Sequence, residues 1–532
     1  MSIGSRKLSR RDFLRVTGGA SMALLVSQSR ALMASVERNL TLAQSGGSVV
    51  TAIGTEPVGL DPCNPWFLGS GLWGMLGLPY DNWWYFGRDG SVVPDASPSW
   101  TRPDEKTVIF DIREGIKYHN SSSEVVADDV VANYKRITNP DLACGGSSAY
   151  EQLVESIVAV DKYKFQVNLK TANLLLTRIP LPPIVDPKQV EANSGPLLLK
   201  IEAGTGPWIL DEWETENYLS FKRNPDYWGK APQFDEFRFQ VMPEERATVA
   251  AMRAGQLNFL PVARIENFVQ LQNEPDINTW SGPSLGYLRL NVNHFRDAFQ
   301  NPDILQALRV GLNRQQFVDT QTQGLGVVSG PMSPAVTRYA LSKEELDKLQ
   351  PYDPDQAKSL LSKAGYDLKD NRLRLDLLSI SGFKNFTDIA QVAQANLRDI
   401  GVDVEIRIQE VGVWVDSRVN RHDYDLSVND YGTSLDPDYT DFRSDQSEQE
   451  WTGGGDPELD KLIDASNVEQ DDEKRKELLQ DIQRKMILNV RELYLYSPPD
   501  LEAASKKITG YTPWPGATNL RVFDQEQVTV ST

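Results

Sequence analysis

Two short segments decide the fold: Gly204-Thr205-Gly206-Pro207-Trp208 and Arg223-Asn224-Pro225-Asp226-Tyr227-Trp228. Glycine and proline in both segments favour turns, and the Asn and Asp side chains of the second segment are typical of local bonds to the backbone. Between the two turns, Tyr218–Phe221 is rich in residues that favour strands. The sequence therefore predicts a strand between two turns, with the aromatic pair that ends the second segment packed beneath its loop.

Strand and helix patterns alternate on both sides of this stretch. The expected strands are Ser48–Ile53, Thr107–Ile112, a hairpin over Ile157–Leu169, Phe237–Val241, Tyr287–Val292, Val402–Ile408 and Leu493–Tyr496. The expected helices are Ala127–Ile137, Pro243–Ala254, Pro302–Gln316, Asp353–Ala364, Phe386–Ile400 and Glu473–Leu488, and turns are expected over Pro498–Pro515. The pattern has no fixed repeat length, so it predicts an α/β protein.

Composition excludes several classes of function. The 532 residues predict two or three domains, and the net charge of −19 argues against binding to nucleic acid or to an anionic membrane surface. The few histidines and cysteines exclude zinc fingers and similar clusters; they are His119, His294, His422, Cys63 and Cys144. P-loop, nucleophile-elbow and dinucleotide-loop motifs are absent from the sequence. We therefore expect a binding protein without cofactor or metal, not an enzyme.

The first residues are typical of an export signal. Ser9–Arg15 matches the twin-arginine pattern, and Val16–Val26 is a mildly apolar run of 11 residues. A membrane-spanning helix needs about 20 residues, so this run indicates a signal peptide. We expect a signal over residues 1–43, the twin-arginine translocase as a partner, and a periplasmic or extracellular protein. Cleavage after Ala34, cleavage after Ala43 and a retained anchor stay open, as do a Cys63–Cys144 disulfide and two buried thiols.

Several segments in a fixed order resemble the bacterial extracellular solute-binding proteins of family 5. Besides the two opening segments, the resemblance rests on Arg246–Phe259, Leu288–Asn291, Gln306–Arg314, Tyr352–Gly365, Ile400–Glu405, Asp423–Leu426 and Leu435–Asp438. The family supplies the peptide-, nickel- and oligosaccharide-binding components of ATP-binding-cassette (ABC) importers. The resemblance therefore implies capture of a solute and delivery to permease and ATPase subunits.

The resemblance also implies a periplasmic-binding-protein-like fold, with two main lobes joined by a hinge and one extra lobe. Lobe I is expected over residues 46–74, 202–283 and 491–532, lobe II over 75–201, and lobe III over 284–490. The ligand would lie between lobes I and III and be enclosed by hinge closure.

Loops at the lobe edges are the expected places for ligand contacts. One such loop follows the first strand and another follows the strand-like run Asp425–Val428, and further tryptophans lie in loop-like segments. The candidate ligand-binding residues are Trp66, Phe67, Trp414, Asp430, Tyr431, Thr433, Ser434, Trp451 and Trp514. We expect Trp66 and Tyr431 to form opposite aromatic walls of the cleft. Thr433 and Ser434 are expected to supply hydrogen bonds.

One position departs from the family pattern. Peptide-binding members carry an acid three places before an Asp-Pro pair, where it meets the peptide amine; here Thr433 stands three places before Asp436-Pro437. Either Asp430 binds the amine in place of that acid, or the ligand has no free amine. Many tryptophans beside hydroxyl groups favour an oligosaccharide; a peptide, a metal chelate and an exported peptide chaperone or enzyme stay as alternatives. Asp436 itself is expected to be structural, capping nearby backbone amides.

Overall fold

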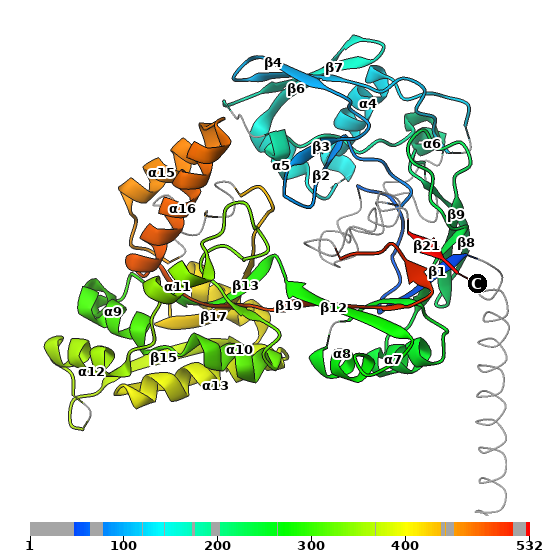
Figure 1. The fold of residues 1–532 in the computed structure, drawn as a ribbon. Helices are drawn as coiled ribbons and strands as arrows, with labels where there is room; N and C mark the ends of the chain where they lie inside the picture. The colour runs from blue at the N-terminus through cyan, green and yellow to red at the C-terminus, as the bar shows by residue number, and fades with distance from the viewer. Residues whose placement is uncertain are drawn as a thin grey trace, which may run out of the picture.

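The computed structural model describes residues 47–63, 78–119, 121–142, 144–172, 176–192, 203–262, 264–367, 369–437, 442, 452–513 and 528–531. Their strands form separate sheets that lie in three parts of the molecule, around a central opening in the ribbon (Figure 1). The limits of the three lobes stay a prediction. One strand lies on the other side of an expected limit: Glu492–Ser497 (β18) belongs to the sheet of lobe III, although residues from 491 onward were expected in lobe I.

Lobe I contains two sheets. The first has the order β1 (Ser48–Ile53), β10 (Glu236–Val241), β9 (Tyr218–Arg223), β8 (Trp208–Glu214), with β1 parallel to β10. Aromatic side chains fill its core, and the ring centroids of Trp208 and Phe234 are 4.7 Å apart. The expected strand between two turns is therefore confirmed as β9.

The two opening segments join this sheet to the chain at 78–81. A Cβ at Gly204 would lie 1.8 Å from the carbonyl oxygen of Pro79, so only glycine fits there. The side-chain Nδ2 of Asn224 donates to the carbonyl of Gly206 at 3.0 Å. Tyr227 and Trp228 both donate to the carboxylate of Asp81, at 3.0 and 2.6 Å. These residues hold two parts of the chain together.

The second sheet of lobe I was only partly expected. It has the order β11 (Phe259–Pro261), β19 (Pro499–Ser505), β12 (Ile277–Pro283), and α7 (Glu245–Arg253) and α8 (Ile265–Leu271) pack on one face. The prediction of turns over Pro498–Pro515 was wrong for β19. That strand has no β-branched residue, and partners on both sides hold it extended.

Lobe II is built on the sheet β4 (Trp100–Asp104), β5 (Thr107–Asp111), β7 (Lys164–Leu169), β6 (Val154–Asp161). The helix α4 (Ala127–Ile137) has the predicted bounds and packs on this sheet with α5 (Ser147–Leu153). Cys63 and Cys144 form a disulfide with Cα atoms 4.7 Å apart, which decides between the two alternatives left open.

Lobe III carries a six-stranded sheet in the order β14 (Val327–Val328), β18, β13 (Gly286–Val292), β17 (Leu426–Gly432), β15 (Leu373–Ile380), β16 (Val402–Gln409). One face packs on α9 (Pro302–Gly311), α10 (Arg314–Thr322), α12 (Pro354–Lys363) and α13 (Lys384–Asp399). The other meets α11 (Lys343–Leu349), α15 (Pro457–Val468) and α16 (Asp472–Leu488). A short helix, α14 (Val411–Val415), continues into a π-helical turn, Asp416–Asn420.

Two expectations about lobe III were wrong. The helix expected over Pro302–Gln316 is broken at Leu312 and Asn313 into α9 and α10, and the Asn313 side chain caps α10 by accepting from the amide of Gln316 at 3.2 Å. Asp430 and Tyr431 lie inside β17, where they pair with β13, and not in a loop after the strand.

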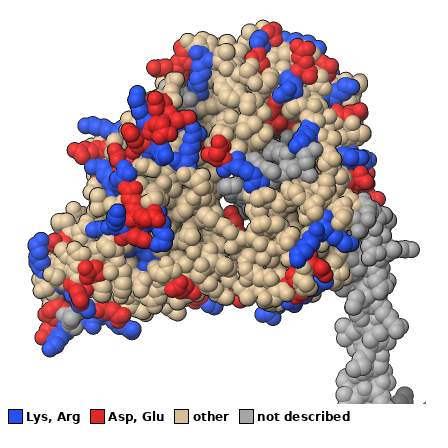
Figure 2. Space-filling model, viewed as in Figure 1, with Lys and Arg blue, Asp and Glu red and all other residues tan. Residues whose placement is uncertain are grey.

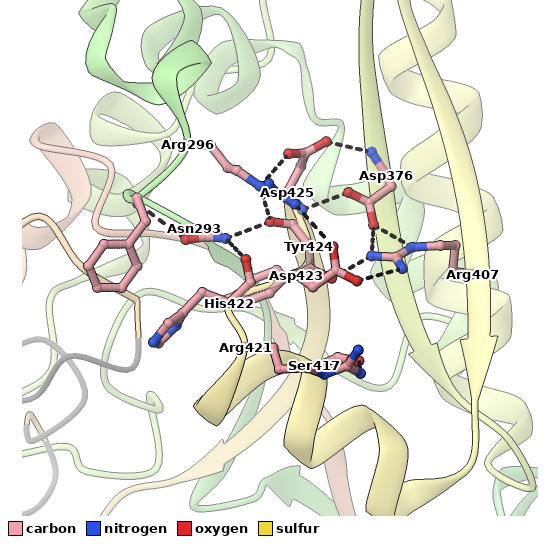
Figure 3. Close-up of polar contacts among 11 residues, drawn as sticks. Asn293, Arg296, Asp376, Arg407, Ser417, Arg421, His422, Asp423, Tyr424 and Asp425 are labelled. Atoms are coloured by element: carbon pink, nitrogen blue, oxygen red, sulfur yellow. Dashed lines mark hydrogen bonds and ion pairs between the residues drawn. The ribbon is translucent and has the colours of Figure 1, made fainter.

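Two carboxylates fix the start of the parallel pair β15 and β17 (Figure 3). The amide of Asp376 donates to Asp425 Oδ2 at 2.9 Å, and the amide of Asp425 donates to Asp376 Oδ1 at 2.8 Å. Arg407 Nε donates to Asp376 at 2.6 Å, and Arg296 Nε lies 3.2 Å from Asp425. This reciprocal contact sets the register at which β17 enters the sheet.

The chain crosses between lobes I and III twice, and both crossings are short. The first runs from β12 to β13 through Ser284, and the second runs from β18 to β19 through Pro498. The amide of Ser284 donates to the carbonyl of Pro498 at 2.9 Å, so the two crossings lie side by side. Figure 1 shows β12 and β19 reaching from lobe I toward lobe III, and Figure 2 shows a hollow above them at the centre of the molecule.

Candidate ligand-binding site

Five polar side chains lie together on the face of the lobe III sheet that meets α14, and we call them the polar layer: Arg289, Asn291, Arg418, Asn429 and Glu492. Strand register places four of them on one face, because Arg289 pairs with Asn429 and Asn291 pairs with Glu492. The fifth, Arg418, comes from the π-helical turn, and its Nη1 donates to Asn291 Oδ1 at 2.9 Å. π-Helical turns are rare and are often found at functional sites.

The polar layer holds two guanidinium groups and one carboxylate. Glu492 accepts from Asn291 Nδ2 at 2.8 Å and from the amide of Val292 at 2.9 Å, and Arg289 Nη1 lies 3.9 Å away. Burial lowers the pKa of Arg418, and so does repulsion by Arg289, while the nearby acids oppose this shift. The layer therefore carries more positive than negative charge, and an anion would relieve the repulsion.

Two of the predicted aromatic residues already have a cation against the ring. The Cζ atom of Arg289 lies 4.5 Å from the centre of the Tyr431 ring, and that of Arg418 lies 4.5 Å from the Trp414 ring. Trp414 lies in α14 and not in a loop. It is 6% exposed, and its Nε1 donates to Ser427 Oγ at 3.0 Å. Trp414 is thus part of the core.

The residues after Tyr431 lie close to the crossing. Thr433 is 5% exposed, and both its amide and its hydroxyl donate to the carbonyl of Leu285, at 2.9 and 2.8 Å. Its hydroxyl therefore holds the end of β17 to the segment before β13. Asp430 is exposed and Ser434 is half-buried. The other predicted contacts, Trp66, Phe67, Trp451 and Trp514, lie outside the described residues.

Asp436 makes structural contacts beyond the expected capping. Its carboxylate forms an ion pair with the buried Arg475 and accepts from the hydroxyl of Thr177 at 2.6 Å. Thr177 belongs to the range expected for lobe II, so Asp436 also joins two parts of the molecule. The expected capping of backbone amides by Asp436 stays a prediction.

Sequence reasoning missed the two arginines of the polar layer. A weak signal exists for Arg289, because it interrupts the apolar run Tyr287–Val292 at an inward position. Arg418 has none, because its position depends on the π-helical turn. In the described part of the chain, no group of three His, Cys, Asp or Glu residues could hold a metal ion. No helix there combines the length and apolar character needed to cross a membrane.

Comparison with known proteins now gives the family. Residues 91–453 match the model of the bacterial extracellular solute-binding proteins, family 5 Middle, which is more than half of the chain. The chain belongs to this family. Its members are binding proteins that act in the periplasm or outside the cell.

The relatives are similar over most of their length. The nickel-binding periplasmic protein of Escherichia coli (strain K12) is 26% identical over 456 residues, which cover 80% of this chain and 85% of that protein. The oligopeptide-binding protein AppA of Bacillus subtilis (strain 168) is 28% identical over 433 residues, which cover 75% of this chain and 77% of that protein.

Solved structures show the same fold. HbpA2 from Haemophilus parasuis matches with a TM-score of 0.78 at 20% identity, over 91% of this chain and 100% of that one. AppA from Bacillus subtilis in complex with a nonapeptide matches with a TM-score of 0.67 at 23% identity, over 91% and 99%. The α/β binding-protein fold expected from the sequence is confirmed.

Proposed function

We propose that this family 5 protein captures a short peptide outside the cytoplasm and delivers it to the permease of an ABC importer, without chemical turnover. The observation that carries the proposal is the excess of guanidinium groups in the polar layer. A peptide supplies the carboxylate that such a layer can bind, whereas a neutral oligosaccharide supplies none. The peptide therefore replaces the oligosaccharide as the favoured solute.

Arg418 is the group that we expect to meet the carboxylate. It is half-buried, and its Nε has no hydrogen-bond partner among the described residues. Hydrogen bonds between a guanidinium and a carboxylate are roughly twice as strong as neutral ones. An anion at this place would use the free donor and offset the repulsion between Arg418 and Arg289.

The aromatic residues favour a sugar less than their number in the sequence suggests. Stacking on a sugar needs an open ring face, but Trp414 is buried and Arg289 covers one face of Tyr431. The names of the relatives also support a peptide. They include AppA and a dipeptide-binding protein of Escherichia coli, which is 25% identical over 461 residues. The twin-arginine pattern at Ser9–Arg15 supports export by that route.

Calorimetric titration tests the proposal with three probes: trialanine, trialanine C-terminal amide and maltotriose. We expect trialanine to bind, the amide to bind about tenfold or more weakly, which is about 1.4 kcal/mol, and maltotriose not to bind. Arg418→Gln should abolish the preference for the free carboxylate.

The matched control is Arg421→Gln. Arg421 lies one turn further along, and its guanidinium is held by Asp416 at 2.7 Å and by Ser417 at 2.6 Å. This variant should keep the preference. Binding of maltotriose with no response to trialanine would contradict the peptide proposal. Equal binding of trialanine and its amide would contradict the role of Arg418.

A further inference from the structure

Lobes II and III touch each other directly. The hydroxyl of Thr177 donates to Asp436 Oδ2 at 2.6 Å. Thr177 follows Leu176, which belongs to the buried core of lobe II. Asp436 forms an ion pair with Arg475 of α16, a helix that packs on the sheet of lobe III. This hydrogen bond therefore joins two parts of the molecule that have separate cores.

A second contact involves the residue before Asp436. The turn between β2 (Trp84–Phe86) and β3 (Val92–Pro94) approaches Leu435 so closely that a Cβ at Gly90 would lie 3.3 Å from the Leu435 carbonyl oxygen. Figure 1 shows β2 and β3 on one side of the central opening and β12 and β19, which lead to the two crossings, on the other. Lobe III is thus connected to lobe I by the crossings and touches lobe II across the opening.

Lobe II is fixed to lobe I by buried contacts. His119 is 3% exposed; its amide donates to the carbonyl of Gly204 at 2.8 Å, and its Nε2 lies 2.8 Å from the carbonyl oxygen of Gly206. The Cζ atom of Arg113 lies 4.9 Å from the centre of the Trp228 ring. We therefore expect lobes I and II to move as one body. Rotation of lobe III at the crossings must then break its contacts with lobe II.

The hydrogen bond between Thr177 and Asp436 is suited to reversible opening. The ion pair with Arg475 keeps the Asp436 carboxylate in place within lobe III. Opening separates only the Thr177 hydroxyl from it, and water can then bind both groups. A hydrogen bond to a charged group still has a net value that shifts an equilibrium by about tenfold or more. The contact therefore favours the closed form without preventing the open one.

We propose that Gly90 and Thr177 of lobe II, with Leu435 and Asp436 of lobe III, form a latch that holds the molecule closed and opens before a solute enters or leaves. The latch acts whatever the solute is, so this inference does not depend on the solute being a peptide. It sets the fraction of closed protein before binding and the rate of release after binding. It does not set which solute is chosen.

The distance between lobes II and III in the protein without solute tests the latch. Spin labels are attached at Glu105→Cys, in an exposed turn of lobe II, and at Glu477→Cys, on the exposed side of α16. The two native cysteines are joined in a disulfide, so only the new thiols react. Pulsed electron paramagnetic resonance should give one main distance. Thr177→Val should raise the ratio of longer distances to this main distance about tenfold.

The matched control is Thr138→Val. The hydroxyl of Thr138 is also half-buried, but it donates within lobe II, to the carbonyl of Tyr134 at 2.9 Å. This variant should keep the distances of the wild type. A lower melting temperature of Thr177→Val with unchanged distances would assign its hydroxyl to stability alone and overturn the latch.

A second pair of variants tests the other contact. Gly90→Ala places a methyl group against the Leu435 carbonyl and should also lengthen the distances. Gly115→Ala is its control, because Gly90 and Gly115 have φ values of +77° and +83°, while a Cβ at Gly115 has nothing within 4 Å. The two variants share the cost of a positive φ. If Thr177→Val does not fold, this pair decides.

Stopped-flow fluorescence adds a measurement with solute. Release of trialanine should be about tenfold faster from Thr177→Val than from the wild type, with the preference for trialanine over its amide unchanged. Unchanged distances in Thr177→Val, or an unchanged rate of release, would overturn the latch. If trialanine does not bind, the proposed function fails alone, and the distances still decide whether the latch exists.

Discussion

At the scale of single residues, the Asp436–Arg475 pair gives the largest expected effect on stability. Arg475 is buried and also donates to the Tyr339 hydroxyl at 3.0 Å and to the carbonyl of Ser466 at 3.1 Å. Asp436→Ala would leave this guanidinium buried without its carboxylate. Such a loss costs about 3–5 kcal/mol, against about 1 kcal/mol for a lost helix cap. Urea unfolding should show a loss in this higher range.

The control for this change is Asp355→Ala. Asp355 is 93% exposed and lies 3.6 Å from Lys358, so its removal should change the free energy of unfolding by less than about 0.5 kcal/mol. A loss of about 1 kcal/mol or less for Asp436→Ala would show that the pair adds little to stability.

The carboxylates of Asp376 and Asp425 predict a dependence of stability on pH (Figure 3). Burial raises the pKa of Asp425 from 3.8 to about 6, and the neighbouring Asp376 carboxylate adds to the shift. The folded state then binds a proton more tightly than the unfolded state. The contribution of this pair to stability is therefore greatest at low pH and falls as the pH rises from about 4 to about 6.

Urea unfolding at pH 4, 5, 6 and 7 measures this effect, as the difference between wild type and Asp425→Asn. The variant should lose less stability than the wild type as the pH rises. Asp403→Asn is the control, since Asp403 is half exposed and pairs with Arg372 at 3.0 Å. Parallel curves for wild type and Asp425→Asn would rule out the raised pKa.

At the scale of elements, the break between α9 and α10 predicts a capping effect. Asn313 accepts from the amide of Gln316, and its own amide donates to Asn396 at 2.6 Å. Asn313→Ala removes the cap and should cost about 1 kcal/mol. Thermal unfolding measures the loss, with Gln315→Ala, exposed on the same helix, as the control. No change in melting temperature for Asn313→Ala would mean that the break does not depend on its cap.

Three elements show what the sequence could and could not predict. The bounds of α4 followed from apolar residues at helical spacing and were confirmed. The break after α9 was missed because Leu308, Leu312 and Phe317 prolong an apolar pattern, and an Asn within it looks like an exposed helix residue. β19 was missed because strand formation there comes from its two neighbours, not from its own residue types.

The candidate site could be predicted only in part. The sequence predicted ligand-binding candidates near the end of β17 because a strand pattern leads into that segment. The register that places Arg289 beside Asn429 is a tertiary property, so the sequence does not show it. Trp414 was misplaced because the sequence does not show that a short helix packs its ring into the core. The two arginines of the polar layer became visible only in the fold.

At the scale of the whole molecule, the two adjacent crossings predict closure on the ligand. β12 and β19 pair from Ile277 and Ser505 to Pro283 and Pro499, and β13 and β18 continue on the other side. Rotation at Ser284 and Pro498 would move lobe III against lobe I while both sheets stay intact. A solute that contacts both lobes would stabilise the closed form.

Small-angle scattering should show this as a smaller radius of gyration at saturating trialanine, with a forward scattering that corresponds to one chain at every concentration. N-acetyl-trialanine amide, which carries neither terminal charge, is the control and should leave the radius unchanged at the same concentration. The comparison tests the cause as well as the motion, because the control lacks the carboxylate that the polar layer is proposed to bind. An unchanged radius with bound trialanine would show that the crossings do not act as a hinge.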